Sequence, residues 1–203
     1  MIKKWQVINS KITYQDKWLK IRSDHCLTGQ NKIVKPYHVL EYPTWVNVVA
    51  LTPKYEIILV KQYRHGAGKI LRGLPSGSVN PTDKSLTAAI RRELKEETGF
   101  SGGKFYEIGQ AYVNPAMQNN FVHSFLAIGV KRKLSLKSYT TMDEETEVLI
   151  KPFLRVVKDI ESKKFEFQSL YLLSIFFAIN FLLTTPKNEF KTLKYHLQTE
   201  LLR

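Results

Sequence analysis

Two neighbouring stretches, residues 44–52 (TWVNVVALT) and 56–65 (EIILVKQYRH), consist largely of apolar and β-branched residues. Only the tripeptide Pro-Lys-Tyr separates them. A connection this short predicts two paired strands, and strands without polar alternation are typical of the centre of a sheet that is buried on both faces. Such a sheet needs covering helices, so the two stretches together predict an α/β layered domain.

The flanking sequence supplies the other expected elements. Residues 17–28 and 31–42 alternate apolar and polar positions around a Gly-Gln-Asn turn, which predicts an N-terminal β-hairpin. Further strands are expected at 104–113, 121–132 and 147–156, a loop at 73–85, and helices at 86–98, 155–165, 170–183 and 188–203. We predict three regions: an N-terminal β-strand region at 1–40, a catalytic domain at 41–185 and a C-terminal helical tail at 186–203.

The expected helix at 86–98 (LTAAIRRELKEET) has a marked apolar face. Leu86, Ala89, Ile90 and Leu94 recur at helical spacing, which suits docking on a sheet. Gly99 follows directly and predicts the C-terminal end of the helix. The helix is therefore expected to pack by one side and present the other.

The other side of this helix is unusually acidic. With about 100° of rotation per residue, Glu93, Glu96 and Glu97 fall within an arc of about 100°. Like charges at this spacing repel each other, and the C-terminal end of a helix dipole disfavours anions. A divalent cation such as Mg²⁺ would remove this cost, because carboxylate oxygens are its preferred ligands. The alternative is a solvated acidic helix in which Arg92 pairs with one of the glutamates.

Length and composition limit the number of domains and the classes of protein to which the chain can belong. The 203 residues fit one domain or one domain with a small lobe, and the single cysteine, Cys26, excludes an internal disulfide framework. We expect a cytoplasmic protein, because the N-terminus lacks a signal-peptide pattern. The longest apolar run, 170–183, is shorter than the roughly 20 residues of a membrane span, so no membrane contact is expected. The net charge of +13 attracts polyanions, although it is spread along the whole chain.

The segment 77–100 resembles the Nudix box, which consists of Gly, five residues, Glu, seven residues and then Arg-Glu-apolar-x-Glu-Glu-x-Gly-apolar. The positions that match are Gly77, Arg92, Glu93, Leu94, Glu96, Glu97, Gly99 and Phe100. Five residues separate Gly77 from Asp83, whereas the residue that stands seven intervening residues before Arg92 is Lys84. The loop is thus one residue longer than the pattern, and its first acidic position is either Asp83 or missing.

The resemblance implies a Nudix fold, in which a mixed β-sheet lies between helices, and a divalent metal site on the acidic helix. The implied ligands of Mg²⁺, with Mn²⁺ as an alternative, are Glu93 and Glu97, then Glu96 and Glu147, with the Ser76 carbonyl completing the set. The box residues Gly77, Arg92 and Gly99 are expected to be structural.

A second acidic cluster at 143–147 gains a role from the same resemblance. The late loop of the branch that hydrolyses ADP-ribose and other nucleoside diphosphate sugars carries Glu-x-Glu, which provides a general base and a metal ligand. Glu145 and Glu147 have this spacing, with Glu144 as the alternative base. The implied catalytic residues are therefore Glu145, Glu97 and Glu93. An exposed acidic loop without a catalytic role is the other reading.

The motifs LVKQYRHG and LPSG and the proline at 115 also resemble this branch. Arg64, Pro115 and Arg72 are the implied substrate-binding residues, because an arginine offers a rigid fork of donors to phosphate. The residue before LPSG is often Glu in the branch, whereas here it is Gly73. This departure bears on which substrate the site accepts.

The resemblance implies Mg²⁺-dependent hydrolysis of ADP-ribose or a related nucleotide sugar to a nucleoside monophosphate and a sugar phosphate. The alternatives are another nucleoside diphosphate derivative (a dinucleotide polyphosphate, a coenzyme or capped RNA) and a Nudix-fold ligand-binding regulator without activity. A homodimer formed through residues 1–40 is expected from the branch. Nucleic acid is not favoured as a partner, because no RNA-recognition motif accompanies the basic charge.

Overall fold

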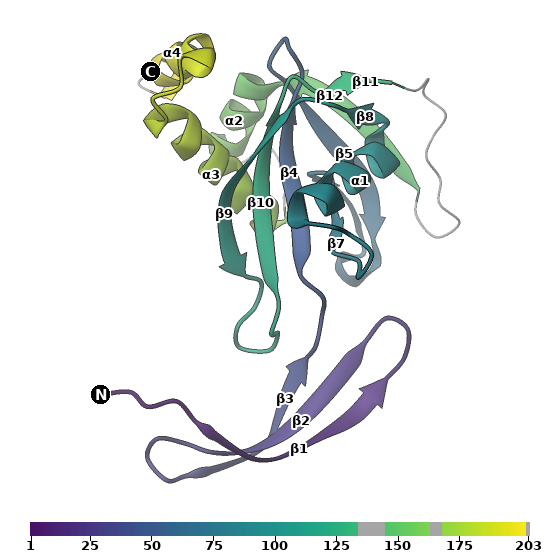
Figure 1. Cartoon of the computed structure of the whole chain (residues 1–203), viewed down its shortest axis with the longest axis vertical. Coiled ribbons are helices and arrows are strands. Elements are labelled where there is room, and N and C mark those ends of the chain that lie inside the picture. Colours follow the sequence, from purple (N-terminus) through teal and green to yellow (C-terminus); the bar gives the residue numbers. More distant parts are fainter. Residues whose placement is uncertain (134–144, 163–167, 202–203) are drawn as a thin grey trace. The chain divides into compact units, whose positions relative to one another are not determined.

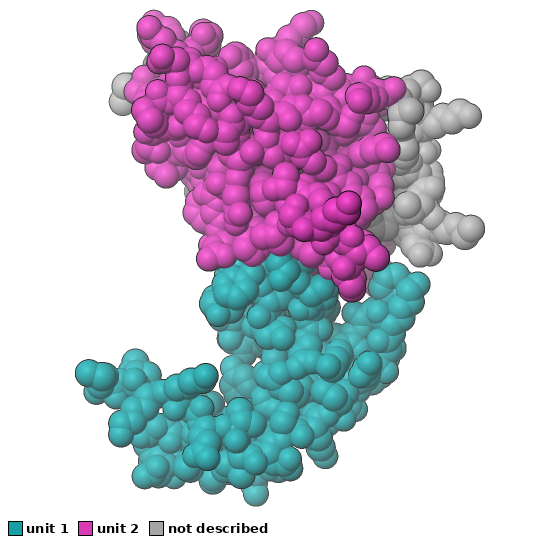
Figure 2. Space-filling view, viewed as in Figure 1, with its two compact units in different colours: residues 1–44, 111–122 teal, residues 45–110, 123–203 magenta. Residues whose placement is uncertain are grey.

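The computed structural model describes residues 1–133, 145–162 and 168–201, and Figure 1 maps their helices and strands. The chain divides into two compact units. One comprises residues 1–44 and 111–122, and the other comprises residues 45–110 and 123–203 (Figure 2). The excursion at 111–122 thus returns a piece of the middle of the chain to the N-terminal unit.

The N-terminal unit is a three-stranded antiparallel sheet in the order β1 (Gln6–Gln15), β2 (Lys20–Leu27), β3 (Ile33–Leu40). The predicted hairpin corresponds to β2 and β3 and is confirmed, whereas β1 was predicted only as part of the N-terminal β-strand region and not as a separate strand. The segment 111–122 attaches to β3 through main-chain and side-chain bonds. Leu40 N–H donates to the Met117 carbonyl at 2.7 Å, and the Tyr37 hydroxyl donates to the Ala116 carbonyl at 2.6 Å.

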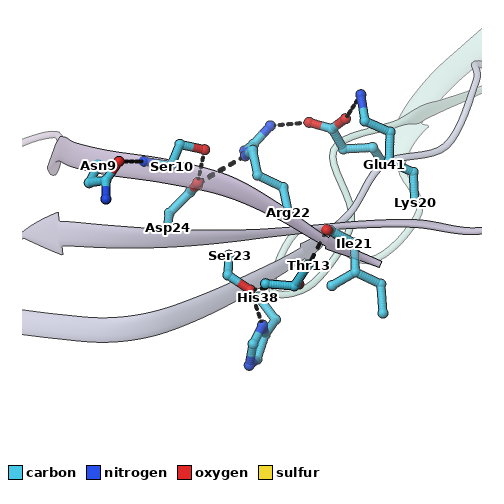
Figure 3. A network of polar contacts seen from close by, with 10 residues as sticks. All are labelled: Asn9, Ser10, Thr13, Lys20, Ile21, Arg22, Ser23, Asp24, His38 and Glu41. Atoms are coloured by element: carbon cyan, nitrogen blue, oxygen red, sulfur yellow. Dashed lines mark hydrogen bonds and ion pairs between the residues drawn. The ribbon is translucent and has the colours of Figure 1, made fainter. Parts of the chain in front are cut away.

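Polar contacts rather than a large apolar core tie these strands together (Figure 3). The buried Asp24 on β2 accepts a hydrogen bond from the Ser10 hydroxyl of β1 at 2.6 Å and from Arg22 Nε at 3.0 Å. Arg22 also pairs with Glu41, which Lys20 contacts at 2.7 Å. Because Asp24 is buried, these partners satisfy a carboxylate that would otherwise be costly to desolvate.

The larger unit is built on a seven-stranded sheet in the order β12-β5-β4-β10-β9, with β6 paired to β5 and β7 paired to β4. The strand bounds are β4 (Trp45–Leu51), β5 (Glu56–Arg64), β6 (Lys69–Gly73), β7 (Ser76–Ser78), β9 (Lys104–Tyr112), β10 (Phe121–Ile128) and β12 (Thr146–Pro152). A separate pair joins β8 (Phe100–Ser101) to β11 (Lys131–Arg132). The adjacent apolar stretches 44–52 and 56–65 do form paired strands, as predicted.

Helices cover both faces of this sheet (Figure 1). They are α1 (Leu86–Thr98), α2 (Phe153–Glu161), α3 (Ser169–Thr184) and α4 (Lys191–Leu201), with short 3₁₀ turns η1 (His65–Ala67) and η2 (Asn188–Phe190). Successive β4 residues point to opposite faces: Val48 packs in the cluster of α1, and Val49 packs in the cluster of α2, α3 and α4. The predicted α/β fold with a sheet between helices is confirmed.

The predicted loop at 73–85 is wrong in part, because Ser76–Ser78 forms β7. β4 and β5 are in register only at Leu51 and Ile57, so the first half of β4 is left for another partner. β7 takes that place by pairing with Trp45–Asn47. Three residues that bond through their main chain need no strand-like composition, which is why the Gly- and Ser-rich sequence indicated a loop.

No single helix in the described ranges is long and apolar enough to cross a membrane. Taken together, the helical segments Ser169–Thr184 and Asn188–Leu201 have the length and apolar composition of a membrane span, but the chain bends by 116° between them.

Candidate active site

The acidic helix α1 is fixed at both ends. The Ser85 side chain caps its start by accepting from Ala88 N–H at 3.1 Å. Gly99 ends it in the left-handed conformation, with φ of 71°, and its N–H bonds to the Lys95 carbonyl at 2.9 Å. Ala89, Ile90 and Leu94 are buried against the sheet, as the apolar face predicted. These contacts set the rotation of α1 and therefore the direction of its glutamates.

Two glutamates of α1 meet successive residues of β7. The Ser76 main-chain N–H donates to Glu97 Oε2 at 2.9 Å. The Glu93 carboxylate lies so close to Gly77 that a Cβ at this position would overlap it. Glycine at residue 77 therefore leaves room for the carboxylate to reach the strand, and a side chain there would displace Glu93 or β7. Helix and strand together place both carboxylates beside the main chain of Ser76–Gly77.

Arg92 joins the box loop to the same carboxylates. Its guanidinium contacts Asp83 through both ends of the fork, at 3.1 Å from Nε and 2.9 Å from Nη2. Nη2 also donates to the Ser78 carbonyl at 3.1 Å, and Nη1 donates to Glu93 at 2.7 Å and Glu96 at 3.2 Å. A planar fork of donors can satisfy this many acceptors at once, which an ammonium group cannot do in fixed geometry.

Asp83 occupies the irregular position of the loop. Its carboxylate accepts from Asn80 N–H at 2.8 Å, and its own N–H donates to the Asn80 carbonyl at 2.9 Å. The hydrogen bonds from Arg92 lower the pKa of the Asp83 carboxyl, with a further contribution from Asn80 N–H. The structure thus gives the bracing contact to Asp83, and the extra residue leaves Lys84 between Asp83 and the Ser85 cap.

Burial sets the electrostatic environment of Glu93. Its side chain is 14% exposed, and burial raises the pKa of the carboxyl even though Arg92 acts in the opposite direction. Glu96 differs, because its side chain is exposed and turns toward Arg92. The carboxylate pressed against β7 therefore carries an electrostatic cost that a cation would offset.

Arg64 and Arg72 lie on the β5–β6 hairpin. Arg64 is the last residue of β5 and hydrogen-bonds to the Tyr171 hydroxyl of α3. Arg72 lies on β6, opposite Lys61 in the antiparallel register of β5 and β6. Tyr171 also contacts Ser76, with 2.8 Å between the two hydroxyl oxygens, and burial raises its pKa. Sequence analysis missed Tyr171, because it opens an apolar run that reads only as core.

The second acidic cluster, residues 143–147, lies only partly within the described residues. Glu144 lies outside the described residues, and Glu145 is an exposed residue that precedes β12. Glu147 is exposed on β12 and accepts from Lys61 Nζ at 2.7 Å. Among the residues that the structure describes, no three His, Cys, Asp or Glu side chains converge on a cation position. The structure places Glu93 and Glu97 beside Ser76–Gly77, and Glu93 also accepts from Arg92. Glu96 and Glu147 are exposed and contact only Arg92 and Lys61 among the interactions that the structure describes.

Pro115 belongs to the N-terminal unit. It lies in the turn that follows Asn114, whose carbonyl accepts from Met117 N–H at 2.9 Å and from Gln118 N–H at 2.7 Å. Its predicted substrate contact stays a prediction.

The oxygen donors at β7 fit a hard divalent cation. Glu93 and Glu97 supply carboxylates beside a main-chain segment that carries the Ser76 carbonyl, and Gly77 leaves the approach free of a side chain. Mg²⁺ commonly takes only a few protein oxygens and retains waters or substrate phosphates for the rest of its shell. Two carboxylates and one carbonyl are therefore a sufficient protein contribution.

A profile of the NUDIX domain matches residues 41–149, more than half of the chain and including both α1 and β7. The chain belongs to the NUDIX family. It is 31% identical over 126 residues to ADP-ribose pyrophosphatase of Bacillus subtilis, which covers 62% of this chain and 67% of that protein. It is 29% identical over 115 residues to GDP-mannose pyrophosphatase of Salmonella typhimurium, which covers 54% of this chain and 59% of that protein.

A solved structure titled "Crystal structure of ADP compounds hydrolase" has the same fold. Its TM-score is 0.75 at 19% identity, over 90% of this chain and 96% of that chain. This likeness supports the fold, and the two relatives support the branch of Nudix pyrophosphatases that includes ADP-ribose and nucleotide-sugar pyrophosphatases. The expected resemblance to this branch is thereby confirmed.

Proposed function

We propose that the protein hydrolyses the pyrophosphate bond of ADP-ribose or a related nucleoside diphosphate sugar, with Mg²⁺ as the cofactor. The observation that carries the proposal is the pair of α1 carboxylates, Glu93 and Glu97, held against the main chain of β7 in a Nudix domain. Relatives named ADP-ribose pyrophosphatase and GDP-mannose pyrophosphatase support this substrate class.

The residues have separate tasks in this proposal. Glu93, Glu97 and the Ser76 carbonyl hold the cation. A bound divalent ion supplies neutralisation of the pyrophosphate charge and a lower pKa for an attacking water. Glu145 accepts the proton of that water, and Arg92 keeps Glu93 in place through its contacts with Asp83 and Ser78.

The reaction consumes only the nucleotide sugar and one water molecule. The water oxygen bonds to one phosphorus, the bridging P–O bond breaks, and the second phosphate leaves with the bridging oxygen. The products are a nucleoside monophosphate and a sugar phosphate. Arg64 and Arg72 contribute positive charge for substrate phosphates from the β5–β6 hairpin.

The decisive experiment compares hydrolysis of ADP-ribose, GDP-mannose, a dinucleotide polyphosphate and capped RNA with and without Mg²⁺. We expect turnover of a nucleotide sugar that EDTA abolishes. Glu97→Gln retains an oxygen acceptor for Ser76 N–H but loses the charge, so it should fold and lose activity. Glu161→Gln, a neutral change at an exposed residue of α2, is the matched control. Equal turnover by Glu97→Gln and wild type would contradict the assignment, and turnover of none of the four compounds would favour a ligand-binding regulator.

We also infer that the N-terminal sheet forms a homodimer with a second copy. β1 is an edge strand whose residues are all exposed, and Val7, Ile8, Ile12 and Tyr14 are exposed large apolar residues on it. An apolar edge strand left open invites pairing with another chain. Light scattering after gel filtration should give twice the mass of 23.6 kDa for wild type and the single mass for Ile8→Glu/Ile12→Glu. A monomeric wild type over a concentration series would contradict the inference.

A further inference from the structure

Residue 73 precedes Leu74-Pro75-Ser76-Gly77 and lies directly against α3. A Cβ built on Gly73 would come within 2.5 Å of Tyr171 Cε2 and 3.1 Å of Cδ2. The Tyr171 ring therefore takes the space that a side chain at residue 73 would need. Helix α3 thus reaches the strand connection that leads into the cation site.

The Tyr171 hydroxyl is directed at that connection. It lies 2.8 Å from Ser76 Oγ, and Arg64 is a second hydrogen-bonding partner. Ser76 in turn donates its N–H to Glu97 at 2.9 Å. A continuous set of contacts therefore runs from α3 through one residue of β7 to a carboxylate of α1.

The side-chain amide of Asn47, which neighbours Ser76, does not hydrogen-bond to the Ser76 hydroxyl in place of Tyr171. Asn47 pairs with Ser76 across β4 and β7, and it is 1% exposed. Within the described ranges, neither the nitrogen nor the oxygen of its amide has a hydrogen-bond partner. Asn47 therefore leaves the hydroxyl of Ser76 to Tyr171.

We propose that Tyr171 is a positioning residue of the cation site. Its hydroxyl fixes Ser76, so that the Ser76 carbonyl and the Glu97 carboxylate are presented together. This inference rests on the proposed function, because it assigns Ser76 and Glu97 to a divalent cation. Partners that orient the ligands of a metal commonly change its affinity or the activity about 10- to 100-fold when they are removed.

The simpler possibility is that Tyr171 only packs, since it is 5% exposed and belongs to the apolar cluster of α3. Tyr171→Phe separates the two, because it keeps the ring against Gly73 and removes only the hydroxyl. Ser76→Ala removes the other hydroxyl and retains the N–H and carbonyl of residue 76. Tyr195→Phe, which deletes a hydroxyl from an exposed tyrosine of α4, is the matched control.

The test measures Mn²⁺ binding to the full-length protein by electron paramagnetic resonance, without substrate. Tyr171→Phe and Ser76→Ala should each weaken Mn²⁺ binding about tenfold. The double variant should be no weaker than either single variant, because the two changes break one contact. Tyr195→Phe should bind as wild type. Unchanged Mn²⁺ affinity in Tyr171→Phe, or additive losses in the double variant, would overturn the proposal.

Turnover of ADP-ribose supplies the second measurement. Tyr171→Phe should lower kcat at saturating Mg²⁺ and raise KM through Arg64, whereas Ser76→Ala should change kcat and leave KM near wild type. A wild type that binds Mn²⁺ but hydrolyses no nucleotide sugar would contradict the proposed function alone, and the Mn²⁺ comparison would still decide the role of Tyr171. A wild type that binds no Mn²⁺ would overturn the positioning role.

Discussion

Replacing Gly77 with alanine tests the geometry of the site directly. The new Cβ would occupy the position of the Glu93 carboxylate, so either the side chain or β7 must move. Forcing one extra methyl group into a packed position costs about 1–3 kcal/mol. For a chain of this length, that corresponds to a fall in Tm of between about 2 and 12 °C.

The effect on turnover should exceed the effect on stability. A displacement of about 1 Å in a group that holds the reacting atoms can lower the rate about 100-fold. We therefore expect Gly77→Ala to fold, to melt a few degrees lower in calorimetry, and to hydrolyse nucleotide sugars about 100 times more slowly. Gly66→Ala is the control, because a Cβ there would meet nothing within 4 Å.

A second change distinguishes crowding from other causes. Glu93→Asp shortens the side chain by one methylene group, so in the Gly77→Ala background it should recover part of the lost Tm while activity stays low. A Gly77→Ala variant with wild-type turnover would refute the placement of Glu93 at β7. A loss of Tm that Glu93→Asp does not relieve would show that the alanine is not crowded by this carboxylate.

Three further predictions follow from the contacts of the fold. Arg92 lowers the pKa of Asp83, so this carboxylate stabilises the fold above its unfolded pKa of about 3.9, and the contribution disappears as pH falls through the lower folded value. Melting in a chelator between pH 2 and 7 should therefore show a steeper acid loss of Tm in wild type than in Asp83→Asn, and parallel curves would contradict the pairing. Gly73→Ala should cost about 1–3 kcal/mol in urea unfolding by crowding the Tyr171 ring, and Tyr171→Leu should relieve part of it. Leu197→Ala, at a fully buried position of α4, should cost about 2–5 kcal/mol in the same assay, and a change below 1 kcal/mol would show that α4 does not pack on the core.

Hydrophobic pattern was sufficient for the elements that carry a strong period or a continuous apolar run. The stretches at β4 and β5 and the helix α1 with its glycine stop are predictable from local sequence, because burial dictates their composition. β7 is not, since its pairing depends on where β4 and β5 separate. β1 is fully exposed and thus lacks the half-buried alternation that marks a strand.

Some residues of the candidate site could likewise be predicted from local sequence, and others could not. The glutamates of α1 follow from helical spacing, and Gly77 follows from the resemblance to the box. Tyr171 could not be assigned, because a tyrosine at the start of an apolar helix has the same pattern whether its hydroxyl meets solvent or Ser76. Residue spacing could not decide whether position 83 or 84 provides the partner of Arg92, because the contact between Asp83 and Arg92 depends on the path of the loop rather than on its length.

The Arg92 fork has a consequence for how the box tolerates insertions. Its two ends bind Asp83 side-on, while Ser78 and Glu93 fix the same guanidinium from the strand and the helix. The backbone between the clamped points is then free to vary in length, provided that one acidic residue can reach the fork. A spacing rule would score this chain as lacking its first acid, although the ion pair is present. Chains with irregular boxes are better sorted by whether an Asp or Glu lies within reach of this arginine than by the residue number at which it falls.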